Sequence, residues 1–251
     1  LDCSGSMSGK PLAQAKKAIQ ACLAILSDQD SFGVVAFNHE VEVLQKKLLE
    51  GDKQNRDKTT GFLDQIDAGG GTDLLLAIKQ AAELLGKETG DLFVVTDGQV
   101  SATEQIHVKA KSLGIRVHVL GIGSAAQDRF LTLLARNTGG ISRYLTAKER
   151  VDMTAVDLFA SIGSPLARNL SVESEGFGEL TIEPDLPNTV FADSPLVLFG
   201  ETGEDGKGSL RVCWDEPLPG STDIKIEIPK EPTGIAESLR LFRGSRLITD
   251  V

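Results

Sequence analysis

The feature that most constrains the fold is an alternation of two apolar patterns between residues 1 and about 165. Short β-branched apolar runs are typical of buried strands, and apolar residues that recur every three or four positions are typical of amphipathic helices. The pattern predicts strands over 31–38, 92–96, 115–122 and 141–145, with an edge strand over 41–48. It predicts helices over 11–27, 62–66, 75–85, 102–113, 126–137 and 147–163, and a glycine loop over 69–72. Strands and helices that alternate in this way indicate an α/β fold with a doubly wound, mainly parallel sheet.

Two pairs of residues match the capping box that opens many helices. Ser101 with Glu104 predicts the start of the helix over 102–113, and Thr146 with Glu149 predicts the start of the last helix. Both helices therefore have a predicted starting point as well as an apolar face.

The character of the sequence changes near residue 165. From 166 to 251, short runs of alternating residues are separated by Gly, Pro and Asp, which is typical of antiparallel strands. The charge changes at about the same place: residues 1–168 carry 19 basic and 20 acidic residues, whereas residues 169–251 carry 7 and 16. We therefore predict an α/β domain over 1–165, with a truncated first strand because Leu1 and Asp2 resemble the end of a strand, and a β-rich region over 166–251.

Composition argues against several classes of function. The net charge is −10, and binding to a nucleic-acid backbone needs a positive surface that displaces counterions. No apolar run approaches the roughly 18–20 residues of a membrane-spanning helix. The three cysteines lie far apart and show no disulfide framework or zinc spacing. None of the three histidines is placed like the base of a catalytic triad, and His118, within an apolar strand, is expected to be a core residue.

The opening stretch LDCSGSMSGK concentrates a carboxylate, several hydroxyls and two glycines. A phosphate-binding P-loop does not match, because Gly5 to Gly9 is one residue too short and Pro11 stands where a metal-binding hydroxyl is needed. A nucleophile elbow does not match either, since Met7 stands two residues after Gly5. A metal site made of oxygen ligands agrees better with these residues.

Five oxygen-bearing residues are candidates for that metal site. Asp2, Ser4 and Ser6 stand where a strand turns toward a helix, and a bend there can aim alternate side chains at one point. Thr72 follows three glycines, and Asp97 ends an apolar strand, where α/β sheets bind their ligands. Each residue also has a purely structural interpretation, because serine and threonine cap helices and aspartate stabilises turns. Taken together, the five side chains suit a hard cation such as Mg²⁺.

The segments DCSGSM, GGGT and VVTDG resemble the three parts of the metal-ion-dependent adhesion site of von Willebrand factor type A domains. That site has the pattern D-x-S-x-S, then a Thr, then an Asp, and its positions correspond to Asp2, Ser4, Ser6, Thr72 and Asp97. This resemblance covers about residues 1–165. The whole chain also resembles the type A region of inter-α-trypsin inhibitor heavy chains and their bacterial relatives, in which a β domain (VIT) precedes the type A domain and a β-rich segment follows it.

The resemblance implies a function as well as a fold. Ser4, Ser6 and Thr72 would ligate Mg²⁺ or Mn²⁺, with Ca²⁺ less favoured, while Asp2 and Asp97 would act partly through water. An open position on the ion would take an Asp or Glu carboxylate from a partner protein, and partner binding would couple to movement of the last helix. The resemblance therefore implies a binding module rather than an enzyme, in an extracellular or cell-surface setting.

Two other functions stay open from the sequence. A magnesium-dependent hydrolase would use the same cluster, with Asp73 or Asp97 as its general base. Alternatively, the acidic region 169–251 would be the main interaction surface for a basic partner, and the metal would be structural.

Overall fold

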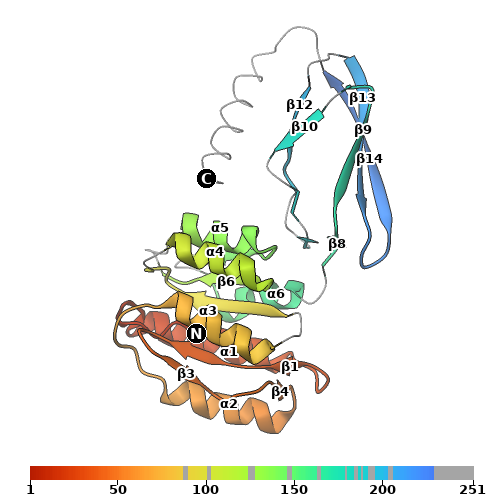
Figure 1. The fold of residues 1–251 in the computed structure, drawn as a ribbon. Helices are drawn as coiled ribbons and strands as arrows, with labels where there is room; N and C mark the ends of the chain where they lie inside the picture. The colour runs from red at the N-terminus through yellow and green to blue at the C-terminus, as the bar shows by residue number, and fades with distance from the viewer. Residues whose placement is uncertain are drawn as a thin grey trace. The chain divides into compact units, whose positions relative to one another are not determined.

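The computed structural model describes residues 1–86, 90–100, 103–123, 128–145, 149–162, 165–178, 180–183, 186–187, 189–191, 196–202 and 206–228. The chain forms two compact units, Leu1–Gly163 and Ser164–Val251 (Figure 1). The strands of the first unit are β1 (Ser31–Phe32), β2 (Val35–Phe37), β3 (Val41–Val43), β4 (Leu49–Glu50), β5 (Asp91–Thr96), β6 (Arg116–Gly121) and β7 (Ser142–Tyr144). Its helices are η1 (Gly5–Met7), α1 (Lys10–Ala24), α2 (Lys53–Gln65), α3 (Leu74–Leu85), α4 (Thr103–Leu113), α5 (Asp128–Asn137) and α6 (Val151–Ile162).

Residues 1–3 form the centre of the main sheet of the first unit. The N–H groups of Leu1 and Cys3 donate to β2, and the N–H of Asp2 donates to Val95 in β5 on the other side. β5, β6 and β7 run parallel to one another, whereas β3 is antiparallel to β2. The order is therefore β3, β2, residues 1–3, β5, β6 and β7, which confirms the predicted α/β fold with a mainly parallel sheet.

Helices cover both faces of this sheet because successive strand residues point to opposite sides. In β5, Val95 belongs to a core cluster with residues of α1, α2 and α6. Its neighbour Val94 belongs to a second cluster with residues of α3, α4 and α5. Ala36 and Phe37 in β2 divide between the same two clusters. The two helix layers thus follow from a sequence period of two in the strands.

Two predicted elements near residue 40 are wrong in extent. The strand predicted over 31–38 is divided into β1 and β2, because Phe32 pairs with Leu49 in β4 while β2 pairs with β3. The edge strand predicted over 41–48 is only three residues long in β3. The chain exchanges pairing partners between β1 and β2, and the continuous apolar pattern of 31–38 contains no sign of that exchange.

The boundaries of two helices also differ from the prediction. α2 begins at Lys53 rather than near residue 62, because the Asp52 carboxylate accepts the N–H of Asn55 and caps the helix. α6 begins at Val151 rather than 147, since the first helical hydrogen bond runs from the N–H of Thr154 to the carbonyl of Arg150. Glu149 therefore lies before the first residue of α6. Ser101 and Thr146, the first residues of the two predicted boxes, lie outside the described residues.

The described part of the second unit consists of antiparallel strand pairs. They are formed by β8 (Ala167–Arg168), β9 (Ser171–Glu175), β10 (Leu180–Glu183), β11 (Thr189–Val190), β12 (Phe199–Thr202), β13 (Gly206–Trp214) and β14 (Gly220–Ile228). β13 pairs along its whole length with β14 and also with β9. Phe177 and Phe191 are fully buried, so this unit has apolar residues of its own to enclose. The predicted antiparallel strands are present.

Part of the acidic charge of the second unit is paired across its strands. Lys207 lies opposite Glu227, and Arg211 lies opposite Asp223 with an Nε–Oδ1 distance of 2.8 Å. All four side chains are exposed, and such pairs contribute little to stability. In the described ranges, no helix of either unit is both long and apolar enough to cross a bilayer.

Candidate metal centre

The candidate site begins at the carboxyl end of the central stretch of the sheet. The backbone of Asp2 and Cys3 is held between β2 and β5, and the chain then turns at Ser4 into η1 and α1. In α/β sheets this end of the strands is where ligands bind. The fold therefore places the opening motif at the carboxyl ends of the central strands, where a ligand site is expected.

Asp2 is the most firmly held residue of the site. Its side chain is fully buried, its Oδ1 accepts the N–H of Ser4 at 2.9 Å, and its Oδ2 accepts the hydroxyl of Thr96 at 2.5 Å. Burial raises the pKa of Asp2, the two hydrogen-bonding residues lower it, and the nearby charge of Asp97 raises it further. The two carboxylates of the candidate site are therefore close enough to repel each other, a repulsion that a divalent cation would relieve.

Ser4 and Ser6 present their hydroxyls to the same place. Their Oγ atoms are 3.1 Å apart, with Ser4 buried and Ser6 exposed. Ser4 precedes η1, but its side chain makes no capping hydrogen bond. The capping interpretation therefore does not account for the Ser4 hydroxyl.

Asp97 follows β5 directly and is almost completely buried. Its Oδ1 accepts the N–H of Gln99 at 3.2 Å, and Gly98 has a φ of 77°, a conformation that glycine adopts without strain. The carboxylate thus has a turn contact, as its structural interpretation requires, and also lies near Asp2. The turn contact is therefore present, and the role of Asp97 as a metal ligand stays a prediction.

The glycine loop that precedes Thr72 lies beside the opening motif. The N–H of Gly5 donates to Gly70 and the N–H of Gly69 donates to Cys3, so the loop is tied to the opening motif. Gly70 has a φ of 73°, and a Cβ there would lie 2.1 Å from the ring of His39. The cap of α3 is Asp73, whose carboxylate accepts the N–H of Leu76, so a helix cap does not explain Thr72.

Thr96 is a residue of this site that the sequence interpretation missed. It is fully buried, donates to Asp2 and accepts the N–H of Gly98 at 2.9 Å. A β-branched threonine at the end of a strand fits the strand pattern by itself, and only its position next to Asp97 hints at another role. Thr96 links the opening motif to the end of β5.

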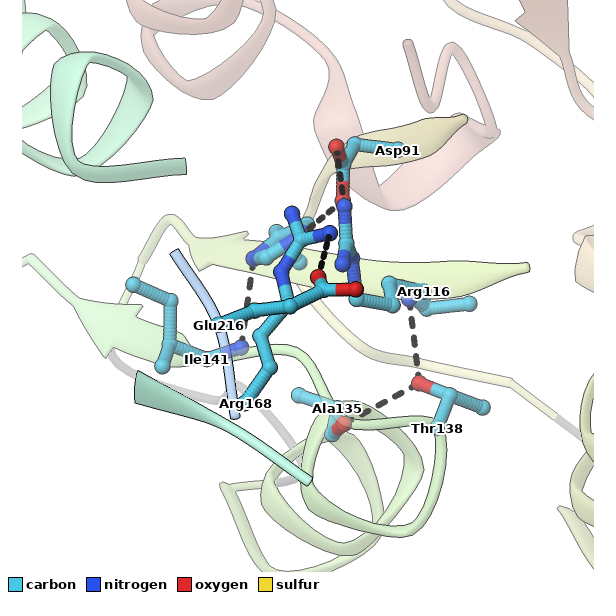
Figure 2. Close-up of polar contacts among 9 residues, drawn as sticks. Asp91, Arg116, Ala135, Thr138, Ile141, Arg168 and Glu216 are labelled. Carbon is cyan, nitrogen blue, oxygen red and sulfur yellow. Dashed lines mark hydrogen bonds and ion pairs between the residues drawn. The ribbon is translucent and has the colours of Figure 1, made fainter. Parts of the chain in front are cut away.

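His118 lies outside the candidate site and has a structural role. Its ring is fully buried, its Nδ1 accepts the N–H of Ile141, and its Nε2 donates to Asp91 at 2.9 Å. Arg116 also binds Asp91 through two nitrogens, at 2.7 and 2.9 Å (Figure 2). Asp91 is the first residue of β5, whereas Asp97 follows the last residue of that strand. This network therefore lies at the amino ends of the parallel strands, opposite the candidate site. His118 is a core residue, as predicted.

The donor set of the candidate site suits a hard cation. Two carboxylates and two or three hydroxyls offer only oxygen, as Mg²⁺ and Mn²⁺ prefer. Among the described residues, no three His, Cys, Asp or Glu side chains gather as a metal-binding group. A metal ion at the candidate site would therefore need serine or threonine hydroxyls as ligands in addition to the carboxylates of Asp2 and Asp97.

Comparison with known proteins identifies the fold and the family. The family model of the von Willebrand factor type A domain matches residues 1–144, more than half of the chain. The chain belongs to the von Willebrand factor type A family. The region matched contains all five candidate ligands of this type A domain.

Relatives of this type A protein come from both groups that the sequence resembles. A von Willebrand factor A domain-containing protein of Dictyostelium discoideum is 28% identical over 211 residues, which are 79% of this chain and 22% of that protein. Inter-alpha-trypsin inhibitor heavy chain H4 of Homo sapiens is 25% identical over 236 residues, 87% of this chain and 25% of the heavy chain. The chain thus spans about a quarter of the length of these relatives.

Solved structures share the type A fold. A von Willebrand factor type A protein from Catenulispora acidiphila has a TM-score of 0.66 and 18% identity, and the match covers 94% of this chain and 68% of that one. The manganese-loaded TRAP protein of Plasmodium vivax has a TM-score of 0.51 and 14% identity, with 92% of each chain covered. At these identities the likeness supports the fold alone.

Proposed function

We propose that this type A domain is a metal-dependent protein-binding module. It holds Mg²⁺ or Mn²⁺ on Asp2, Ser4, Ser6, Thr72 and Asp97, and the ion captures an Asp or Glu carboxylate of a partner protein. The observation that carries the proposal is the gathering of oxygen groups at the ends of residues 1–3 and β5, with the glycine loop tied beside them. Two carboxylates roughly neutralise a divalent cation, and the hydroxyls supply neutral ligands.

The surroundings of the site support the approach of a protein partner. Ser6, Gly71 and Gln99 are exposed, whereas Asp2 and Asp97 lie buried beneath them. A cation held over the buried carboxylates would meet an acidic side chain from this exposed rim, and the rim would supply specificity. The manganese in the related TRAP structure is consistent with a divalent cation on this fold.

The rival function, a hydrolase, has less support from the geometry. One candidate base, Asp73, caps α3 and accepts the N–H of Leu76. The other, Asp97, is part of the proposed metal site itself. His118 is fully buried against Asp91 at the opposite edge of the sheet. We therefore propose a binding module in place of a metal-dependent enzyme.

Nuclear magnetic resonance with a pair of short peptides tests the proposal. One peptide carries a central glutamate and the other carries glutamine at the same position. With Mg²⁺ present, we expect the glutamate peptide to shift the amide signals of Gly5, Ser6 and Gly71, and the glutamine peptide to leave them unchanged. Addition of a chelator should abolish the shifts. Equal shifts with both peptides, or shifts that survive the chelator, would contradict carboxylate capture by a metal.

A further inference from the structure

His39 lies at the same edge of the sheet as the candidate metal centre, although the proposed function gives it no role. Phe37 ends β2 and pairs in parallel with Asp2, and its carbonyl accepts the N–H of Cys3. Because neighbouring parallel strands end at the same edge of a sheet, the residues after Phe37 lie on the same side as the turn at Ser4. His39 follows Phe37 by two residues and is exposed.

The His39 ring lies against the glycine loop that precedes Thr72. A Cβ at Gly70 would overlap the Nδ1 and Cε1 atoms of this ring, so the ring occupies space that only a glycine leaves open. The carbonyl of Gly70 accepts the N–H of Gly5, which stands between the two serines of the site. Gly70 therefore contacts both the imidazole and the opening motif, and this places His39 on the rim of the candidate site.

Hydrogen bonds fix the backbone on both sides of His39. The N–H of Asn38 donates to the carbonyl of Glu40 at 2.9 Å, and the side chain of Asn38 accepts the N–H of Glu40 at 2.8 Å. The carbonyl of Asn38 accepts the N–H of Asp73, the residue after Thr72, at 2.6 Å. The backbone that carries His39 is thus tied to the loop that carries Thr72, which reduces the cost of ordering the ring when a partner binds.

The imidazole of His39 has no hydrogen-bond partner among the residues that the structure describes. His107 and His118, in contrast, both bond to side chains of the first unit. A neutral imidazole offers one N–H donor, and a carboxylate accepts hydrogen bonds at both of its oxygens. A carboxylate that places one oxygen on a metal ion therefore has a second oxygen available for such a donor.

We propose that His39 is a specificity-determining residue, whose Nε2–H donates a hydrogen bond to the second oxygen of the partner carboxylate. Nε2 is the donor because Nδ1 is the ring atom that lies closest to Gly70. The inference rests on the proposed function, since it concerns the carboxylate that the metal ion captures. With one oxygen on the ion and the other on His39, the site favours a carboxylate over a single hydroxyl or carbonyl group, which would reach the ion alone.

Two substitutions of His39 test this role with the glutamate and glutamine peptides. His39→Phe preserves a ring over Gly70 and removes both nitrogens, whereas His39→Gln provides an N–H donor near the position of Nε2. We expect His39→Phe to weaken binding of the glutamate peptide in Mg²⁺ about tenfold, as the loss of one hydrogen bond implies. His39→Gln should recover most of that affinity. Both variants should bind Mg²⁺ as the wild type does, because His39 is not one of the metal ligands.

Two further measurements separate recognition from a structural role. The ring ¹⁵N signals of His39 should shift when the glutamate peptide binds in Mg²⁺, and the glutamine peptide should leave them unchanged. The matched control is His107→Phe, which changes a ring that bonds Asn137 on α5. This variant should bind the glutamate peptide as the wild type does.

The outcomes distinguish this inference from the proposed function. If the wild type binds the glutamate peptide only in Mg²⁺ and His39→Phe binds it equally well, the role of His39 is wrong and the proposed function stands. If the wild type shows no metal-dependent preference for glutamate over glutamine, both are wrong. Loss of Mg²⁺ affinity in folded His39→Phe, with no recovery in His39→Gln, would instead make His39 a support of the glycine loop and overturn the inference.

Discussion

The substitution Asp91→Asn tests how the amino ends of β5 and β6 are held together. The Asp91 carboxylate binds Arg116 through two nitrogens and also accepts a hydrogen bond from the buried His118. Burial alone would raise the pKa of Asp91, but the hydrogen bonds from His118 and Arg116 and their charges outweigh it and hold the pKa at about 2. Asparagine has nearly the shape of a protonated aspartic acid, so the variant removes the charge while it preserves the packing.

The expected magnitude follows from that pKa. The shift from the ordinary value of 3.8 to about 2 is nearly two units, and each unit corresponds to about 1.36 kcal/mol. The folded pKa is lowered, so this stabilisation is fully present above pH 4 and is lost as the pH falls toward 2. We therefore expect Asp91→Asn to lower the free energy of unfolding by about 2 kcal/mol at pH 7, and by progressively less below pH 4.

Urea unfolding followed by circular dichroism at 222 nm measures this difference. The signal reports on helices, which in the described part of the chain belong to the first unit. The matched control is Asp152→Asn, which removes a surface pair with Arg150 and should lower stability by much less than Asp91→Asn does. An Asp91→Asn variant as stable as the wild type at pH 7, or a difference that does not shrink in acid, would refute the reasoning.

Three further predictions concern the site and its surroundings. Thr96→Val removes the hydroxyl that donates to Asp2 and should weaken Mg²⁺ binding about 10–100-fold in calorimetry. The control Thr59→Val, also at a buried threonine, should leave the Mg²⁺ affinity unchanged. Equal Mg²⁺ affinities of Thr96→Val and the wild type would remove Thr96 from the site. Asp73→Ala should lower the free energy of unfolding by about 1 kcal/mol through the lost cap of α3, with Mg²⁺ affinity unchanged; lost affinity would place Asp73 among the ligands. Hydrogen exchange in α6, which packs on α1, should change when Mg²⁺ and a glutamate peptide bind; unchanged exchange would contradict coupling to this helix.

Most of the fold could be predicted because its strands are either buried on both faces or clearly alternating. The runs around Val94 and Val119 are mostly apolar, and the structure pairs them in parallel between two helix layers. The boundaries that were wrong depend on contacts that local pattern does not contain. The cap by Asp52 extends α2 through a polar segment, and the exchange of partners between β1 and β2 is decided by residues 41–50.

The candidate site was predictable to the extent that its residues form a motif. Asp2, Ser4 and Ser6 are neighbours in sequence, and the structure brings their side chains together directly. Thr96 was missed because its role depends on a hydrogen bond to a residue 94 positions earlier.

Calorimetric titration of Mg²⁺ and Mn²⁺ into metal-stripped protein tests the central claim most directly. The wild-type chain should bind one ion, and the variants Asp97→Ala and Ser4→Ala should lose that binding while they keep the circular dichroism spectrum of the wild type. Asp64→Ala, in the exposed part of α2, is the matched control and should bind normally. A single saturable site lost in both variants is the predicted result. Binding that survives in folded Asp97→Ala and Ser4→Ala, or no binding by the wild-type chain, would contradict the account.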